Sequence, residues 1–163
     1  MRVSGEREEV PASAPRFLFW RALAAFLALP GIVAFLGPWL MRPTGTPFRA
    51  IGFAPLGVGI VLLLWCVRDF YAVGRGTLAP WTPPVRLVIV GLYRVTRNPM
   101  YVAVLLILSG WALGFASRDL WIYAGIVAVL FHLRVVLMEE PWLTRRHGEA
   151  YMAYKAKVPR WLV

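Results

Sequence analysis

Two clusters of polar residues adjoin the apolar stretches in the second half of the chain. The first is the run 93–101, which contains Arg97 and Asn98. The second begins with Glu139 and Glu140, directly after an apolar stretch. Charged residues set against apolar stretches are costly to place and are usually functional. Both clusters are therefore candidate binding or catalytic sites.

The residue types in these clusters suit a small molecule that carries several different polar groups. Arginine binds carboxylates, and carboxylates bind ammonium groups and hydroxyls. Aromatic faces bind planar rings and cations. When such a molecule carries its own leaving group, the protein has to orient and desolvate the reactants and needs neither a strong nucleophile nor a metal. The two clusters together supply these types.

The run Arg97-Asn98-Pro99-Met100-Tyr101 places a guanidinium, an amide and a phenol around a predicted helix start. Proline is favoured in the first turn of a helix, and a helix N-terminus attracts anions. An anion-binding role for Arg97 and Asn98 is one interpretation. The other is purely structural, with arginines at a membrane surface, a helix-starting proline and an interfacial tyrosine.

The pair Glu139-Glu140 is expected to continue the helix that precedes it. On a regular helix one face would hold His132, Val136, Glu139, Leu143 and Arg146. This spacing predicts that His132 and Glu139 point at one site, with Glu140 rotated by about 100°. Pro141 is expected to bend the helix. The alternative is a pair of solvated charges and a histidine that is simply hydrogen-bonded.

The composition indicates a membrane protein. The chain has 163 residues, of which 60% are hydrophobic and 16% are charged, against about 25% charged in soluble domains. The formal net charge is +10, but the basic residues cluster at the ends of apolar stretches, as in membrane proteins. No continuous basic face for nucleic acid is present in the pattern. Because Cys66 is the single cysteine, no internal disulfide and no metal site is expected.

Four stretches are long and apolar enough to span a bilayer. They are Phe17–Met41, Ala50–Val73, Pro99–Ala116 and Asp119–Met138. The predicted fold is an all-α integral membrane bundle of about four transmembrane helices in one domain, residues 17–163. Residues 1–16 are predicted to form a disordered cytoplasmic tail.

Single residues predict details of these four helices. Pro30-Gly31 is expected to kink the first helix. In the second helix, Gly52, Gly57 and Gly59 are expected to let a neighbouring helix approach closely. Asp119 is a candidate N-cap for the fourth helix, and the short connection before it predicts a tight antiparallel hairpin with the third.

The distribution of basic residues predicts the topology. With the N-terminus in the cytoplasm, the outer loops hold only Arg42, Arg49 and Arg118, and the other basic residues outside the spans are cytoplasmic. Both termini and both polar clusters are then cytoplasmic. The C-terminal residues Gly148, Tyr151, Tyr154, Lys155 and Arg160-Trp161 are predicted to form an amphipathic interfacial helix, with Trp161 as a membrane anchor.

The run 74–161 resembles the isoprenylcysteine carboxyl methyltransferase and phospholipid methyltransferase superfamily. The resemblance rests on the order and spacing of Gly74-Arg75-Gly76-Thr77, Ala79-Pro80-Trp81, Pro83-Pro84, Gly91, Tyr93, Arg97-Asn98-Pro99-Met100-Tyr101, His132, Glu139-Glu140-Pro141, Leu143, Gly148, Tyr151, Tyr154 and Val158-Pro159-Arg160. It implies a small helical membrane enzyme that binds S-adenosylmethionine at the cytoplasmic face. The acceptor would reach the site laterally from the bilayer.

The resemblance also implies which residues bind the cofactor. They would be Tyr93, Arg97, Asn98, Pro99, Tyr101, His132, Glu139 and Glu140. Glu140 and His132 are the candidates for a catalytic base, if the acceptor needs one. The chain departs from the family pattern at Thr82 and Leu92, which affects only a turn, and at Ala103, which narrows a close approach and bears on the substrate class. The acceptor stays open between lipid-like and prenylated molecules, and the reaction between O-, N- and S-methylation. The implied location is a bacterial inner membrane, with membrane lipids as partners and no obligatory protein partner.

Two other functions are compatible with the pattern. A membrane reductase of the sterol-reductase type resembles this superfamily in its Asn-Pro-x-Tyr box and would use NADPH. The Glu139-Glu140 pair and the short chain favour the methyl donor instead. A non-catalytic membrane scaffold would keep the fold and would tolerate replacement of Glu139 and Glu140 without loss of ligand binding.

Overall fold

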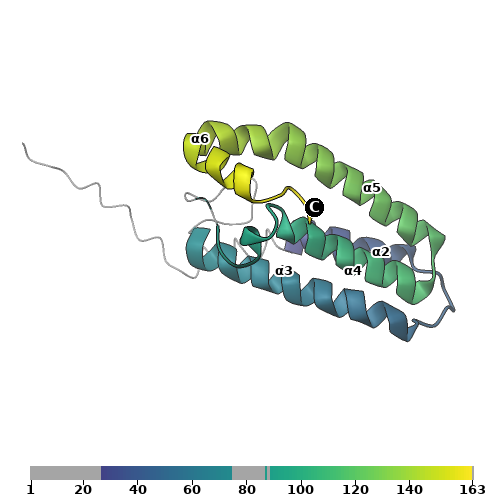
Figure 1. Ribbon diagram of the computed structural model, residues 1–163. Coiled ribbons are helices and arrows are strands. Elements are labelled where there is room, and N and C mark those ends of the chain that lie inside the picture. The colour runs from purple at the N-terminus through teal and green to yellow at the C-terminus, as the bar shows by residue number, and fades with distance from the viewer. Residues whose placement is uncertain (1–26, 75–86, 88, 163) are drawn as a thin grey trace, which may run out of the picture.

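The computed structural model describes residues 27–74, 87 and 89–162 (Figure 1). The elements are η1 (Leu27–Leu36), α2 (Gly37–Met41), η2 (Ala50–Gly52), α3 (Phe53–Gly74), η3 (Gly91–Arg94), α4 (Pro99–Phe115), α5 (Arg118–Arg134), η4 (Val135–Glu139) and α6 (Glu140–Lys157). Every regular element within these residues is helical, which confirms the all-α prediction. The predicted tail 1–16 and the motifs in 75–86 lie outside the described residues.

Helix α4 is the centre of the bundle, with α3 and α5 packed against it (Figure 1). Its small and branched residues, Ala103, Val104, Ile107 and Leu108, are all buried. They pack against residues of the other helices, namely Ala34, Leu63, Ala124 and Val127. A helix in the middle of a bundle contacts neighbours on several sides, so its sequence is apolar almost all round. The site-bearing residues at its first turn are therefore held on the most buried helix.

Two glycines, Gly52 in η2 and Gly59 in α3, allow close contact with α4. A Cβ atom on Gly52 would lie 2.5 Å from the Cα of Gly114, and one on Gly59 would lie 2.7 Å from the carbonyl oxygen of Ala103. Both distances confirm the predicted close approach of a neighbouring helix at Gly52 and Gly59. Gly57 contradicts the prediction, because a Cβ atom there would meet nothing within 4 Å. Gly57 lies two residues from Gly59, so it is turned by about 160° away from the α4 contact.

This difference makes a matched pair of variants. Gly59→Ala is expected to lower the free energy of unfolding by about 1–3 kcal/mol, because the added methyl forces α3 and α4 apart. Gly57→Ala is expected to leave it unchanged or to raise it by up to about 1 kcal/mol, because alanine is the better helix former. Thermal unfolding in detergent compares the two. Equal effects of both substitutions would contradict the packing described here.

The turn between α4 and α5 confirms the predicted hairpin. Ala116 adopts a left-handed conformation with φ of 48° and ends α4. The N-cap of α5 is Ser117, whose side chain accepts a hydrogen bond from the backbone N–H of Leu120. The prediction of Asp119 as N-cap was wrong, because α5 begins one residue earlier and Asp119 lies in its first turn. Pro99 is in the first turn of α4, as predicted.

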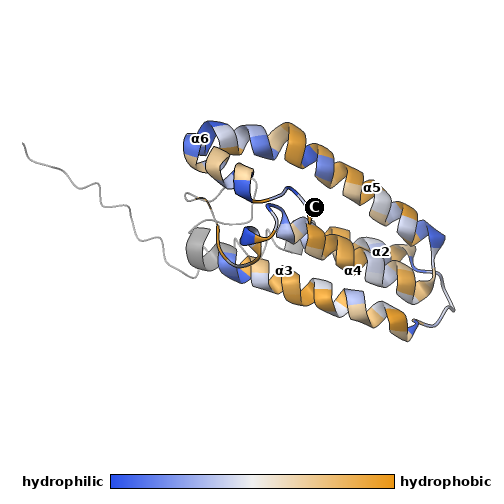
Figure 2. Ribbon diagram, viewed as in Figure 1, coloured by the Kyte–Doolittle hydropathy of each residue, from blue (hydrophilic) through white to orange (hydrophobic). Residues whose placement is uncertain are grey.

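Two helices of the described residues are long and apolar enough to cross a membrane, Ala50–Asp69 and Arg118–Lys157. The apolar helices Pro30–Met41 and Pro99–Phe115 are shorter. Hydrophobic residues run along α3 and α4, whereas hydrophilic residues gather over α6 (Figure 2). The outer faces of α3 and α5 expose large apolar side chains, including Val58, Val61, Leu64, Ile122, Ile126 and Leu130. Such faces suit contact with lipid, and the orientation of the two termini stays a prediction.

Candidate functional site

The end of α5 widens into the π-helical turn η4, Val135–Glu139. The backbone N–H of Glu140 bonds to the carbonyl of Val135, five residues earlier. Pro141 follows at once and has no N–H for a regular α-helical bond. A π-turn holds one extra residue, so it shifts the faces of the helix on either side of it. The helical face predicted to carry both His132 and Glu139 is therefore interrupted, and the two side chains contact different partners.

A bend at Gly148 turns α6 back toward α4 (Figure 1). Gly148 has φ of 51° and ψ of −125°, which is not helical, and glycine adopts this conformation without a steric penalty. The second half of α6 thereby brings Lys155 back to the first turn, where its Nζ donates to Oε2 of Glu140 at 3.2 Å. The bend at Gly148 thus closes the site from the C-terminal side.

The C-terminal residues after α6 run along the residues that precede α4. The backbone N–H of Arg97 donates to the carbonyl of Pro159 at 2.9 Å. The carbonyl of Arg160 accepts hydrogen bonds from the Thr96 hydroxyl at 3.1 Å and from the Asn98 side-chain amide at 3.0 Å. These bonds fix the two chain segments, which lie more than sixty residues apart in sequence, at one place.

Glu140 is the most highly bonded carboxylate of the described residues. It accepts from Nη1 of Arg97 at 2.9 Å, and from Nε and Nη2 of Arg160 at 2.7 and 3.0 Å, besides Lys155. The side chains of Arg97 and Glu140 are only 9% and 8% exposed. A buried carboxylate with this many charge-assisted bonds is a structural centre. Glu140 thereby joins α6, the C-terminal residues and the start of α4.

The environment of Glu140 also sets its ionisation. Glu140 lies beyond the apolar part of the helix. Burial alone would raise its pKa, but the hydrogen bonds from Arg160 and Lys155 and the charge of Arg97 outweigh burial and lower the pKa below its usual value. Glu140 is therefore ionised at neutral pH and is a weak proton acceptor there.

Glu139 lies in a more open environment. Its Oε1 accepts hydrogen bonds from the Tyr101 hydroxyl and, at 2.8 Å, from Nε of Arg134. Its side chain is 30% exposed, and no hydrogen bond from the described residues reaches Oε2. Glu139 therefore has an oxygen available to a ligand.

The tyrosines of α6 face the site. Tyr151 is 1% exposed and its hydroxyl accepts from Nη1 of Arg97 at 3.3 Å. The Tyr154 hydroxyl donates to the carbonyl of Tyr93 at 2.7 Å. Both tyrosines are buried with Val158 in one cluster. The prediction that they belong to an amphipathic helix lying in the membrane interface was wrong, because the bend at Gly148 turns them inward.

His132 pairs with the C-terminal tryptophan. The indole N–H of Trp161 donates to Nδ1 of His132 at 3.3 Å, and the two rings stack with centroids 6.2 Å apart. The pair is exposed at the edge of the cluster. Trp161 was predicted only as a membrane anchor, and the structure instead gives it a specific partner.

The structure thus brings most of the predicted site residues together. Arg97 and Glu140 bond directly, Tyr101 and Glu139 bond directly, and Tyr93 is held through Tyr154. Asn98 and Pro99 lie at the start of α4 beside them. Several partners of these residues were not predicted as site residues. They are Thr96, Arg134, Tyr151, Lys155 and Arg160. The Val158-Pro159-Arg160 run, where proline ends a helix, was the available signal for the C-terminal contribution.

The net charge of the polar cluster and its unpartnered hydrogen-bond donor indicate what kind of ligand it can bind. Four cationic side chains, Arg97, Arg134, Lys155 and Arg160, surround the two carboxylates, so the cluster is net positive. The buried Nε of Arg97 has no hydrogen-bond partner among the described residues. A buried donor without a partner is costly and is available to an anionic group. Within the described residues, no group of three His, Cys, Asp or Glu side chains that could hold a metal ion occurs.

Comparison with known proteins gives the family. An uncharacterized protein of Haemophilus influenzae is 35% identical over 63 residues, which are 39% of this chain and the whole of that protein. No solved structure shows significant similarity to the chain. A family model described as phospholipid methyltransferase matches residues 48–150, which include α3, α4, α5 and the start of α6. Because the match spans more than half of the sequence, the chain belongs to the phospholipid methyltransferase family.

Proposed function

We propose that this protein transfers a methyl group from S-adenosylmethionine to a lipid-like or prenylated acceptor. Family membership supports methyl transfer at a membrane. The observation that carries the proposal concerns two groups in one polar cluster that have no hydrogen-bond partner among the described residues. They are Oε2 of Glu139 and the buried Nε–H of Arg97. These are the two groups needed to hold an amino-acid moiety by both of its ends.

The residues present fit the donor. Nε of Arg97 would bind its carboxylate, and Oε2 of Glu139 would bind its ammonium or a ribose hydroxyl. The stacked rings of His132 and Trp161 offer an aromatic surface for the adenine. The bound donor supplies an activated methyl on a sulfonium together with its own leaving group. The protein's part is to bind, orient and exclude water.

In this proposal Glu140 has a positioning role. Its lowered pKa makes it a poor base at neutral pH, and its four hydrogen bonds hold Arg97 and the C-terminal residues in place. His132 stays the candidate for a base. Because its Nδ1 accepts from Trp161, the neutral ring carries its proton on Nε2. To accept a proton at Nδ1, His132 would have to release Trp161.

The acceptor is proposed to arrive from the lipid. Leu137 and Met138, directly before Glu139 in the π-helical turn, are 68% and 63% exposed. An apolar acceptor lying on these side chains would hold its polar end next to Glu139. We place the site on the cytoplasmic side of a bacterial inner membrane, where the donor is available.

A methyl-transfer assay tests the proposal. The full chain is reconstituted in vesicles of total bacterial lipid and supplied with S-adenosylmethionine labelled in its methyl group, and the lipid phase is separated and counted. We expect label in a lipid product, lost with Glu139→Gln and kept with Glu149→Gln, an exposed glutamate of the same helix. Label that never enters the lipid phase, together with oxidation of NADPH supplied in a parallel reaction, would favour the reductase.

A further inference from the structure

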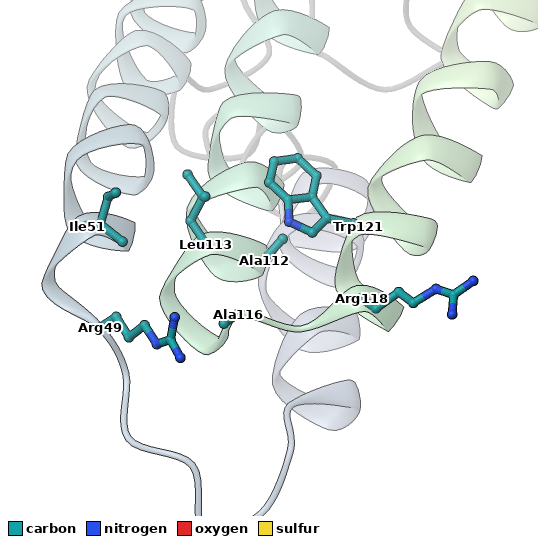
Figure 3. Close-up of a pocket in the computed structure, with 7 residues that line it drawn as sticks. All are labelled: Arg49, Ile51, Ala112, Leu113, Ala116, Arg118 and Trp121. Atoms are coloured by element: carbon teal, nitrogen blue, oxygen red, sulfur yellow. The ribbon is translucent and has the colours of Figure 1, made fainter.

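A groove of about 470 Å³ lies at the opposite end of the bundle from the polar cluster. Helix α4, 17 residues long, separates the two by about 25 Å at about 1.5 Å per residue. The groove is lined by Arg49, Ile51, Leu113, Ala116, Arg118 and Trp121 (Figure 3). It is formed where the start of α3 and the α4–α5 turn meet. This site takes no part in the chemistry proposed above.

The rim of the groove is cationic. Arg49 is anchored through its backbone N–H, which donates to the carbonyl of Gly114 at 2.7 Å. Its side chain extends toward Ala116, whereas that of Arg118 extends outward from the start of α5 (Figure 3). Neither guanidinium has a hydrogen bond or ion pair with a described residue. Both are therefore available to an anion.

The walls of the groove are apolar. Ile51 is 64% exposed and Trp121 is 45% exposed, and Leu113 lies between them. The apolar outer faces of α3 and α5 continue from these walls along the bundle. A ligand that matches both parts has an anionic head and an apolar chain. Arginine is the side chain best suited to bind a phosphate in this setting.

The surrounding charges support an anionic occupant. The described residues 41–51 and 116–120 contain three arginines and one aspartate. The third arginine, Arg42, is already occupied, because its guanidinium lies 3.4 Å from the ring centroid of Trp39. Three arginines against one aspartate leave these two segments net positive, and two of the three arginines, Arg49 and Arg118, line the groove.

We propose that this groove binds one anionic phospholipid of the membrane leaflet opposite the polar cluster. Arg49 holds the headgroup phosphate, Arg118 supplies a second charge at the rim, and an acyl chain lies along Trp121 and the outer face of the bundle. Anionic lipids are attracted to exposed basic residues at a membrane surface. A direct bond between guanidinium and phosphate adds to this attraction.

Native mass spectrometry of the full chain in detergent tests the proposal. The probes are dioleoyl phosphatidylglycerol, dioleoyl phosphatidylcholine and sodium phosphate, each titrated separately. We expect retention of phosphatidylglycerol in preference to phosphatidylcholine, and one bound copy lost or weakened roughly tenfold in Arg49→Gln/Arg118→Gln. Arg42→Gln is the matched control, since it removes a charge from the same end but not from the groove.

Three results would overturn the proposal. One is equal retention of phosphatidylcholine and phosphatidylglycerol, because the charge would then play no part. Another is unchanged phosphatidylglycerol binding in the double variant. The third is sodium phosphate binding as well as the lipid, which would make the site one for a free anion. Because the groove is remote from Glu139, none of these results bears on methyl transfer.

Discussion

The Glu140→Gln variant is expected to lose about 3–5 kcal/mol of unfolding free energy, which is the usual cost of breaking a buried ion pair. The substitution keeps the size of the side chain but leaves the guanidinium of Arg97, 9% exposed, without a counter-charge. It also weakens the bonds that Lys155 and Arg160 make to this carboxylate. Donor binding should fall with the stability, since the same bonds position the C-terminal residues.

Denaturation in detergent, followed by circular dichroism, measures this loss. Glu149→Gln is the matched control, because Glu149 is exposed on the same helix and has no partner among the described residues. A double-mutant cycle with Arg97→Met isolates the ion pair, and the two substitutions should be strongly non-additive. Loss of stability below about 1 kcal/mol in Glu140→Gln would show that the pair is solvated rather than buried.

The lowered pKa of Glu140 gives a second test of its ion pairs, which is the pH dependence of stability. Because the folded-state pKa is lower than the unfolded-state value of about 4.3, the stabilisation is fully present above that value and is lost as the pH falls through the folded-state pKa. The wild-type chain should therefore lose stability as the pH falls below about 4.3, and Glu140→Gln should lose less stability over the same acid range. The same acid dependence in both proteins would assign the effect to other groups.

Glu139→Gln is expected to have the opposite balance of effects. Its carboxylate is 30% exposed, so removal of its charge should change the unfolding free energy by less than about 1 kcal/mol. Loss of a charge-assisted bond to the donor should raise the dissociation constant of S-adenosylhomocysteine by roughly 10- to 100-fold. Calorimetric titration of the folded variant measures this dissociation constant. Unchanged affinity, or a loss of stability as large as that of Glu140→Gln, would contradict the separate roles given to the two glutamates.

Much of the fold follows from local sequence signals. Pro99 marks the start of α4. The short connection between the end of α4 and the start of α5 makes these two helices antiparallel. Gly59 lies at a helix contact because the absence of a side chain allows α4 to approach. The predicted N-cap of α5, Asp119, lies two positions after the observed N-cap, Ser117. Serine and aspartate are comparable caps, and only the turn conformation of Ala116 decides between them.

The site was harder to predict because its geometry depends on departures from a regular helix. The spacing of His132 and Glu139 predicts a shared face only if 3.6 residues per turn hold throughout. Pro141 was recognised as a cause of bending, but a π-turn changes which residues align and no single residue specifies it. Gly148 likewise reverses the direction of α6, which turns Tyr151 from a candidate membrane contact into a buried partner of Arg97.

Which charged side chains pair within the site could not be predicted from the sequence, for a different reason. The residue types of Arg97, Glu139 and Glu140 indicate binding of a charged ligand. They do not indicate which of the two glutamates pairs with Arg97. The second half of α6 and the residues after it decide which glutamate is paired. Lys155 and Arg160 both donate to Glu140, and neither donates to Glu139. Such long-range contacts arise from the packing of the whole bundle.

Calorimetric titration of S-adenosylhomocysteine into the purified full chain in detergent, beside NADPH and the Glu139→Gln variant, tests whether the polar cluster binds a methyl donor. We expect saturable binding of S-adenosylhomocysteine at one site, weakened in Glu139→Gln, and no binding of NADPH. A ligand that binds only the folded state also raises the melting temperature, which confirms the result in the same sample. Binding of NADPH alone, or no binding of either molecule by a folded sample, would contradict the assignment of the polar cluster as a methyl-donor site.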